Sequence, residues 1–282
     1  MARLAEIEGH IAAMNELSDI VGAMRSLAGM RVQEAQHALP GIRRYAASIS
    51  GGIGAALLLM PQPASQLRGS GARPALVLCA AEHGFVGGFN ERLIEAAEAA
   101  SLPGDALFVL GSRGAVLALE RGRRPAWTAA MATRPAGAPE TVRRLSVELY
   151  AGIARGKISR VEVMFGRSRQ GSAPAIERRL VLPLDLASLA LRQPRQAPLH
   201  NIVPQVLLEG LMSEYVFALL TEAAVESIAS ENVARFAAME AAHDNVSKRL
   251  DQLRQSARQA RQSEITAELL DLVTGIEALS GR

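Results

Sequence analysis

The 282-residue chain has few aromatic residues, a single cysteine and only two lysines. Aromatic residues make up 4% and hydrophobic residues 49%, so a core must take its bulk from Leu, Val, Ile, Met and Ala, which favours close-packed helices. The one cysteine, Cys79, excludes an internal disulfide and fits a reducing, cytoplasmic setting. The Arg-rich stretches lack interleaved aromatic residues and the net charge is only +3, so we expect no nucleic acid among the partners.

The chain also lacks a long apolar run and any motif for catalysis or metal binding. Residues 53–60 are too few to cross a bilayer, and Glu209 and Glu214 interrupt the apolar stretch 206–220. We therefore expect contact with a membrane only through partners. The five histidines are scattered without metal-ligand spacing, and no nucleophile elbow is present. No catalytic residue, metal or cofactor is predicted.

What is present at the two ends is helical periodicity. Residues 3–60 predict one long helix, with a kink or short break at Pro40-Gly41, because apolar residues recur at steps of three and four: Ile7, Ile11, Met14, Leu17, Val21, Met24 and Ala28. Residues 205–279 contain no proline and predict a second helix of roughly 110 Å at 1.5 Å per residue. Its residues with the spacing of a coiled-coil seam are Val246, Leu250, Leu253, Ala257 and Ala260.

Between the helices the period changes to that of an α/β domain. Strands are predicted at 75–80, 106–110, 126–131, 158–165 and 174–183, and helices at 90–100, 112–120 and 139–155. The predicted fold is a Rossmann-like, largely parallel α/β domain inserted between two helices that form a long antiparallel coiled coil. We divide the chain into residues 1–72, 73–192, a linker at 193–204, and 205–282. The C-terminal helix should outrun its partner, and its free end then needs a protein sleeve.

A glycine-rich loop, 82–90, follows the first predicted strand. It lacks the spacing of a dinucleotide fingerprint, so we favour a tight strand-to-helix turn over nucleotide binding. For Glu82 and His83, which are the most site-like pair in the chain, we favour helix capping and solvation over chemistry.

Several motifs together resemble the gamma subunit of F-type ATP synthases. The loop 82–90 resembles that family's D-R-G-L-C-G-G-x-N pattern, with Val86 where Cys is common, and Arg25 stands where Glu is usual. The resemblance covers nearly the whole chain and is carried by residues 6–11, 20–25, 82–90, 110–114, 230–235, 239–245, 260–269 and 273–279. A gamma subunit of a divergent, second ATPase operon stays open.

The resemblance implies a non-catalytic rotor shaft that couples rotation of a proton- or sodium-translocating c-ring to conformational change in a ring of alpha and beta subunits. The implied partners are the alpha and beta subunits, the epsilon subunit and the c-ring. The implied place is the cytoplasmic face of the bacterial inner membrane, with no direct membrane contact.

The family positions at the contact with the alpha–beta ring match Met24, Arg25, Arg235, Gln262, Thr266 and Glu268, and the structural loop matches Gly84, Gly87, Gly88 and Asn90. Two simpler interpretations stay open: Met24 as a seam residue and Arg235 on a solvated helix face. Gln262 and Thr266 lie four residues apart, hence on one helix face. The small side chains of Ala237, Ala238, Ala241 and Ala242 suit a helix that turns in a tight sleeve.

Two alternatives to a rotor stay open, and a third family with a similar hairpin does not fit. A static helical scaffold with an inserted α/β module would bind partners without turning. A small nucleotide-binding enzyme with helical extensions would hold a nucleotide. Vacuolar-type central-stalk subunits share a long hairpin but lack an α/β domain of this size.

Overall fold

The computed structural model describes residues 2–60, 73–100, 104–169, 172–190 and 199–280. The chain forms two compact units. One unit comprises Met1–Leu27 with Phe236–Arg282, and the other comprises Ala28–Arg235. Two long helices, α1 (Ala2–Leu57) and α6 (Pro204–Ser280), contribute residues to both. The predicted boundaries at 72, 192 and 204 separate the helical segments from the α/β segment. The division into two compact units does not test them, and they stay a proposal.

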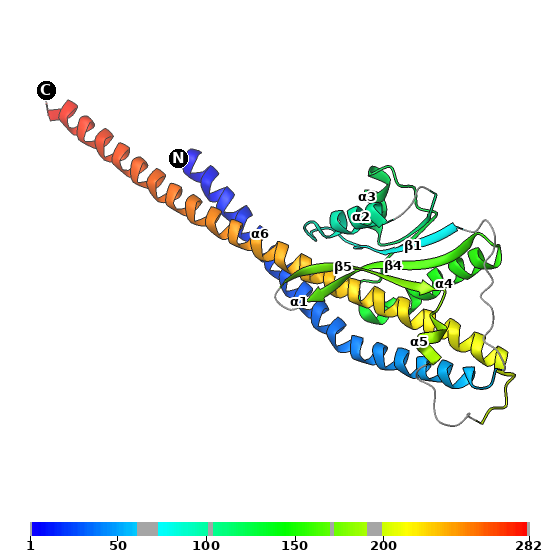
Figure 1. The fold of residues 1–282 in the computed structure, drawn as a ribbon. Coiled ribbons are helices and arrows are strands. Elements are labelled where there is room, and N and C mark those ends of the chain that lie inside the picture. The colour runs from blue at the N-terminus through cyan, green and yellow to red at the C-terminus, as the bar shows by residue number, and fades with distance from the viewer. Residues whose placement is uncertain (1, 61–72, 101–103, 170–171, 191–198, 281–282) are drawn as a thin grey trace. The chain divides into compact units, whose positions relative to one another are not determined.

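In the first unit, which we call the coiled-coil unit, α1 and α6 form the predicted antiparallel pair (Figure 1). Two ion pairs fix the direction: Arg25 with Glu240 at 2.9 Å, and Glu8 with Arg261 at 2.9 Å. Their numbers sum to 25 + 240 = 265 and 8 + 261 = 269, so one helix runs down as the other runs up. Residue 2 therefore lies opposite about residue 265, and α6 continues to Ser280 without an α1 partner.

The seam predicted on α6 is confirmed, and the α1 stripe needs one correction. Val246 and Leu250 are buried, and the next three seam positions are half-buried. On α1, however, Leu17 is 40% exposed and Ser18 is half-buried. A seven-residue repeat passing through residues 7, 11, 14, 18 and 21 places Ser18 toward the partner, so the local register prevails over side-chain hydrophobicity.

Of the kink or short break predicted at Pro40, the break was wrong, because α1 is helical through both Pro40 and Gly41. Proline removes one backbone donor and leaves the Gln36 carbonyl without its usual helical partner. Both Pro40 and Gln36 are exposed, so water can reach that carbonyl. Ala35 and Leu39 on the other face are buried in the core, and this packing holds the helix on either side of the proline.

The second unit contains the sheet. Its strand order is β3-β2-β1-β4-β5, parallel except for the antiparallel β4–β5 pair. The predicted parallel α/β pattern is confirmed, and a short helix, α5, and a 3₁₀ turn, η1, add to it. The elements are β1 (Arg73–Cys79), α2 (Phe89–Ala100), β2 (Ala106–Leu110), α3 (Ser112–Glu120), β3 (Trp127–Ala129), η1 (Pro135–Gly137), α4 (Ala138–Ala154), β4 (Ile158–Arg169), β5 (Ser172–Leu182) and α5 (Leu186–Ala190).

Helices cover both faces of this sheet, because its parallel strands are apolar on both sides. Val77 and Cys79 of β1 face a core that includes α4 and the parts of α1 and α6 in this unit. Leu76 and Leu78 face the opposite way, toward α2 and α3 (Figure 1). Because β1, β2 and β3 are parallel neighbours, their carboxyl ends lie side by side at one end of the sheet, and the glycine-rich loop follows β1 there.

Candidate functional site

The glycine-rich loop 82–90 connects β1 to α2 as a tight turn. Phe85 and Gly87 have positive φ angles of 60° and 53°. Asn90 is buried, and its Oδ1 accepts a hydrogen bond of 3.0 Å from the Ala81 N–H across the turn. Phe85, by contrast, is 68% exposed despite its left-handed backbone. The loop thus holds a phenyl ring at the surface at a cost in backbone strain.

Glu82 acts as the predicted helix cap. Its carboxylate accepts hydrogen bonds from the Ser112 N–H at 3.0 Å and the Ser112 hydroxyl at 2.7 Å, at the first residue of α3. It also accepts one from the Met131 N–H at 2.8 Å, just after β3. Burial alone would raise the pKa of Glu82, but these hydrogen bonds outweigh it and lower that pKa. The Glu82 carboxylate thus links the segments that follow β1, β2 and β3, and both of its oxygens already accept hydrogen bonds within the chain.

Arg235 of α6 holds the same loop from the other side. Its guanidinium donates to the Gly84 and His83 carbonyls at 3.3 Å, to Asn232 Oδ1 at 3.0 Å and to Glu231 Oε1 at 2.6 Å. The side chain is only 11% exposed, so the interpretation as a solvated helix face was wrong. Arg235 therefore fixes the conformation of this loop. Gly84, Gly87 and Gly88 supply the backbone of that loop.

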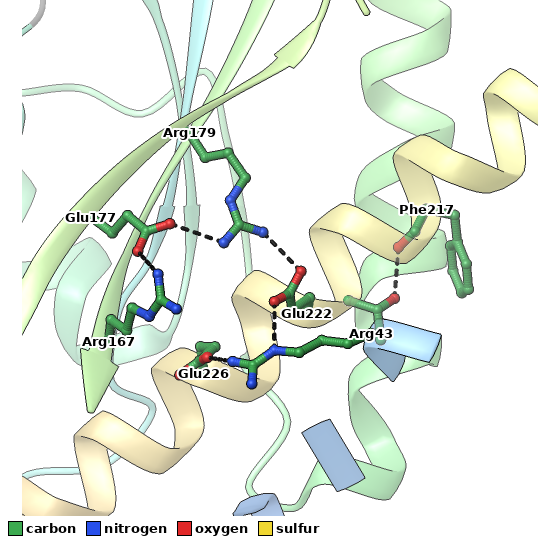
Figure 2. Close-up of polar contacts among 8 residues, drawn as sticks. Arg43, Arg167, Glu177, Arg179, Phe217, Glu222 and Glu226 are labelled. Atoms are coloured by element: carbon green, nitrogen blue, oxygen red, sulfur yellow. Dashed lines mark hydrogen bonds and ion pairs between the residues drawn. The ribbon is translucent and has the colours of Figure 1, made fainter. Parts of the chain in front are cut away.

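A network of three arginines and three glutamates, which the sequence did not reveal, joins α1, α6 and the β4–β5 hairpin. Figure 2 shows Arg43 of α1 between Glu222 and Glu226 of α6, and Arg179 of β5 between Glu222 and Glu177. Arg167 of β4 completes it at 2.7 Å from Glu177.

Burial within this network has opposite outcomes for two of its carboxylates. Burial raises the pKa of Glu226, whose side chain is 5% exposed, despite the nearby Arg43 and Arg167. For Glu177, burial acts in the same direction, but the hydrogen bonds from Arg167 and Arg179 outweigh it and lower the pKa. The Arg179 guanidinium also lies 5.0 Å from the centre of the Phe165 ring.

Met24 and Arg25, two of the predicted contact residues, lie in the coiled-coil unit and are both half-buried. Arg25 pairs with Glu240 through partly exposed side chains, 33% and 47%, so its charge has a partner within the chain. Screening by solvent makes such a pair worth at most about 1 kcal/mol. Arg25 can therefore exchange Glu240 for an outside carboxylate at little cost.

The other three predicted contact residues lie near the end of α6. Gln262, Thr266 and Glu268 are exposed, and the Thr266 hydroxyl donates to the Gln262 carbonyl at 2.8 Å. Five large apolar side chains of the same segment are also exposed: Ile265, Leu269, Leu270, Leu272 and Val273, at 52%, 57%, 60%, 63% and 51%. The spacing of 265, 269 and 272 puts three of them on one face of the helix. This end of α6 thus carries an apolar face beside the predicted polar contacts.

Comparison with known proteins gives matches along the full chain. A family model described as ATP synthase matches residues 3–279. The ATP synthase gamma chain of Moorella thermoacetica is 27% identical over 292 residues, covering 99% of this chain and all of that one. That of Saccharopolyspora erythraea is 26% identical over 309 residues, covering 99% and 98%.

Solved structures with low sequence identity share the fold. A chain of the Euglena gracilis mitochondrial ATP synthase, in a structure of its F1 part and c-ring in rotational state 3, superposes with a TM-score of 0.63 at 11% identity, covering 99% of this chain and 95% of that one. A chain of the Tetrahymena thermophila mitochondrial central stalk and c-ring has a TM-score of 0.55 at 16% identity, covering 79% and 99%. Within the part of this chain that the structure describes, no helix is long and apolar enough to span a membrane.

Proposed function

Since this chain belongs to the ATP synthase family as a gamma chain, a non-catalytic subunit of the F-type central-stalk rotor, we propose that its coiled-coil unit turns inside a ring of alpha and beta subunits. The observation that carries this proposal is the end of α6. It continues past α1 and exposes Ile265, Leu269 and Leu272 on one helix face. An apolar face on a lone helix is stable in water only when another protein covers it.

Rotation couples to catalysis if the shaft touches one catalytic site differently from the other two. The coiled coil meets this need, because its two helices carry different residues and one is longer. In this proposal Met24, Arg25, Gln262, Thr266 and Glu268 contact the ring directly, while Arg235 acts through the carbonyls of the glycine-rich loop.

The second unit, Ala28–Arg235, which we call the α/β unit, is the proposed binding region for the epsilon subunit and the c-ring. The complex then lies on the cytoplasmic face of the bacterial inner membrane, which the chain reaches through these partners. The sheet supports such docking, because β3 and β5 are its two edge strands and adding a strand at an edge is a common mode of protein recognition.

The first experiment separates a rotor from a static scaffold. The chain is co-purified with the alpha and beta subunits of its own organism, and a Val147→Cys variant carries a bead. Val147 is 61% exposed on α4, whereas the only native cysteine, Cys79, is buried with its pKa raised to about 12 by burial, so labelling of this chain before assembly is selective. We expect ATP-driven rotation of the bead. A complex that hydrolyses ATP while the bead stays fixed would mean a static scaffold.

The second experiment tests the contact residues. A Gln262→Ala/Thr266→Ala variant should lower ATP hydrolysis by the complex by about tenfold, the effect of losing one or two interfacial hydrogen bonds. Gln255→Ala removes an exposed polar side chain from the same helix and serves as the control. Equal activity of the double variant and the control would remove both residues from the contact set.

A further inference from the structure

A concave site lies at the end of the sheet opposite to the end that carries the glycine-rich loop. It is a cavity of about 630 Å³ at the amino-terminal ends of β1, β2, β3 and β4, closed on one side by the end of α4. Arg73, Ala106, Trp127 and Ile158, at or next to the first residues of the four strands, all line it. Its volume is in the range of small-molecule sites, and none of the residues predicted to contact the alpha–beta ring lines it.

Four cations surround this cavity: Arg73, Arg124, Arg155 and Lys157. Two carboxylates, Asp105 and Glu148, also line it, so its charge is four minus two, or +2. Of these two carboxylates, Asp105 already interacts with another group. Among the described residues, no acidic group lies within ion-pair distance of Arg124, Arg155 or Lys157. Arg73 donates only to the Gly104 carbonyl, at 3.4 Å, so three of the four basic groups have no acidic partner among the described residues.

The simplest alternative is that Arg155 and Lys157 neutralise the carbonyl end of α4. The backbone already does this. The Arg155, Gly156 and Lys157 N–H groups donate to the carbonyls of Ala151, Ile153 and Gly152 at 3.1, 2.8 and 2.9 Å, with Gly156 at a φ of 67°. Because these carbonyls have donors, the two basic side chains are left for another role.

The remaining wall is aromatic and apolar. Trp127 and Phe108 pack with ring centres 6.2 Å apart, and Leu107, Ala126 and Ile158 complete the lining. Arginine binds phosphate oxygens through paired N–H donors, and lysine does so as a point charge. We propose that this cavity binds a phosphate-bearing anion of at least two negative charges, held by Arg73, Arg124, Arg155 and Lys157. A free di- or triphosphate and an anionic lipid headgroup share this chemistry.

Trp127 gives a direct readout, because it is the only tryptophan of the chain and lines the cavity. The purified full chain is titrated with pyrophosphate and tripolyphosphate at constant ionic strength while Trp127 fluorescence is followed. We expect a saturable change whose Kd is weakened by about tenfold in Arg155→Ala and in Lys157→Ala, the loss of one charge-assisted contact each. Lys157→Arg should retain binding, which guards against misfolding as the cause.

Arg113→Ala is the matched control, because it removes the same charge from α3 beside the glycine-rich loop, where Arg113 lines a different cavity. A second arm uses vesicles of phosphatidylcholine with and without cardiolipin, whose headgroup carries two phosphates and two negative charges. A response to cardiolipin alone, lost in Lys157→Ala, assigns the site to a lipid headgroup, and saturation by pyrophosphate assigns it to a free anion. No saturable response in either arm, or equal weakening by Arg113→Ala, would overturn the proposal.

Discussion

At the scale of single residues, Gly111 is the position where the fold tolerates least. Its φ is 108°, and a Cβ there would lie 2.4 Å from the Ala80 carbonyl oxygen. Gly111→Ala should therefore destabilise the chain by about 2 kcal/mol or more, since both the backbone conformation and a backbone contact become unfavourable. Gly41→Ala is the control: its Cβ meets nothing within 4 Å on an exposed helix turn, so stability should rise by up to about 1 kcal/mol. Urea unfolding of both variants checks this, and equal midpoints would contradict it.

Glu82 predicts a pH dependence with a definite sign. Its pKa is lower in the folded chain than in the unfolded one, where it is about 4.3. The carboxylate therefore contributes stability that is present above the unfolded-state pKa and is lost as pH falls through the lower folded-state pKa. Glu82→Gln should cost about 1 kcal/mol at pH 7 and progressively less below pH ~4. Unfolding of both proteins as a function of pH measures this, and a penalty that is the same at every pH would refute the role.

At the scale of elements, the arginine–glutamate network decides how firmly α1 is held to α6 in the α/β unit. Arg43→Met leaves Glu222 and Glu226 without their α1 partner, in sites where their side chains are 12% and 5% exposed. We expect a loss of about 1–3 kcal/mol, reduced from the value for a fully buried pair because Arg43 itself is 45% exposed.

The matched control for Arg43 is Arg143→Met on α4. Its pair with Glu140 is exposed on both sides, 68% and 58%, so the loss should stay below about 0.5 kcal/mol. A second substitution, Glu226→Gln, should restore part of the stability of Arg43→Met, because it removes one of the carboxylates left without a partner. No recovery would show that the loss in Arg43→Met does not come from a carboxylate left without a partner at Glu226.

The sequence predicts the elements well where their signal is local. Seam spacing from Val246 to Ala260 and the apolar run of β1 each follow from a periodicity that short windows contain. Two kinds of feature were out of reach. The helix through Pro40 depends on burial of Ala35 and Leu39 by residues far along the chain. The bond from Arg43 to Glu222 joins residues 179 positions apart, which no local pattern encodes.

The candidate site divides in the same way. Gln262 and Thr266 share a helix face, as their spacing of four predicts, and a hydrogen bond joins them. Arg235, taken from the sequence as a contact or solvated residue, instead holds a loop 151 residues away. The basic cavity was also not predicted, because it gathers residues from the starts of four strands and the end of a helix, which meet only when the sheet forms.

At the scale of the whole molecule, the proposed rotor must turn within its partners, and this makes side-chain size on α6 a test of function. Ala237 and Ala241 are exposed in the coiled-coil unit and lie four residues apart, hence on one face. Replacing both with Trp adds bulk where a close sleeve leaves no room. We expect ATP-driven turnover and bead rotation to slow by about tenfold or more, because in each turn the two indole side chains must then pass the alpha and beta subunits that enclose α6.

Two controls make that result specific. Ala99→Trp puts the same bulk on an exposed position of α2 in the α/β unit and should leave turnover unchanged. Ala238 and Ala242 are half-buried, so Trp there would disturb the helix pair itself and lower stability as well as turnover. The Ala237→Trp/Ala241→Trp variant should instead keep the thermal stability of the isolated chain. Unchanged turnover in that variant would mean that no sleeve encloses this part of α6, and the rotor proposal would then rest on the exposed end at Ile265–Val273 alone.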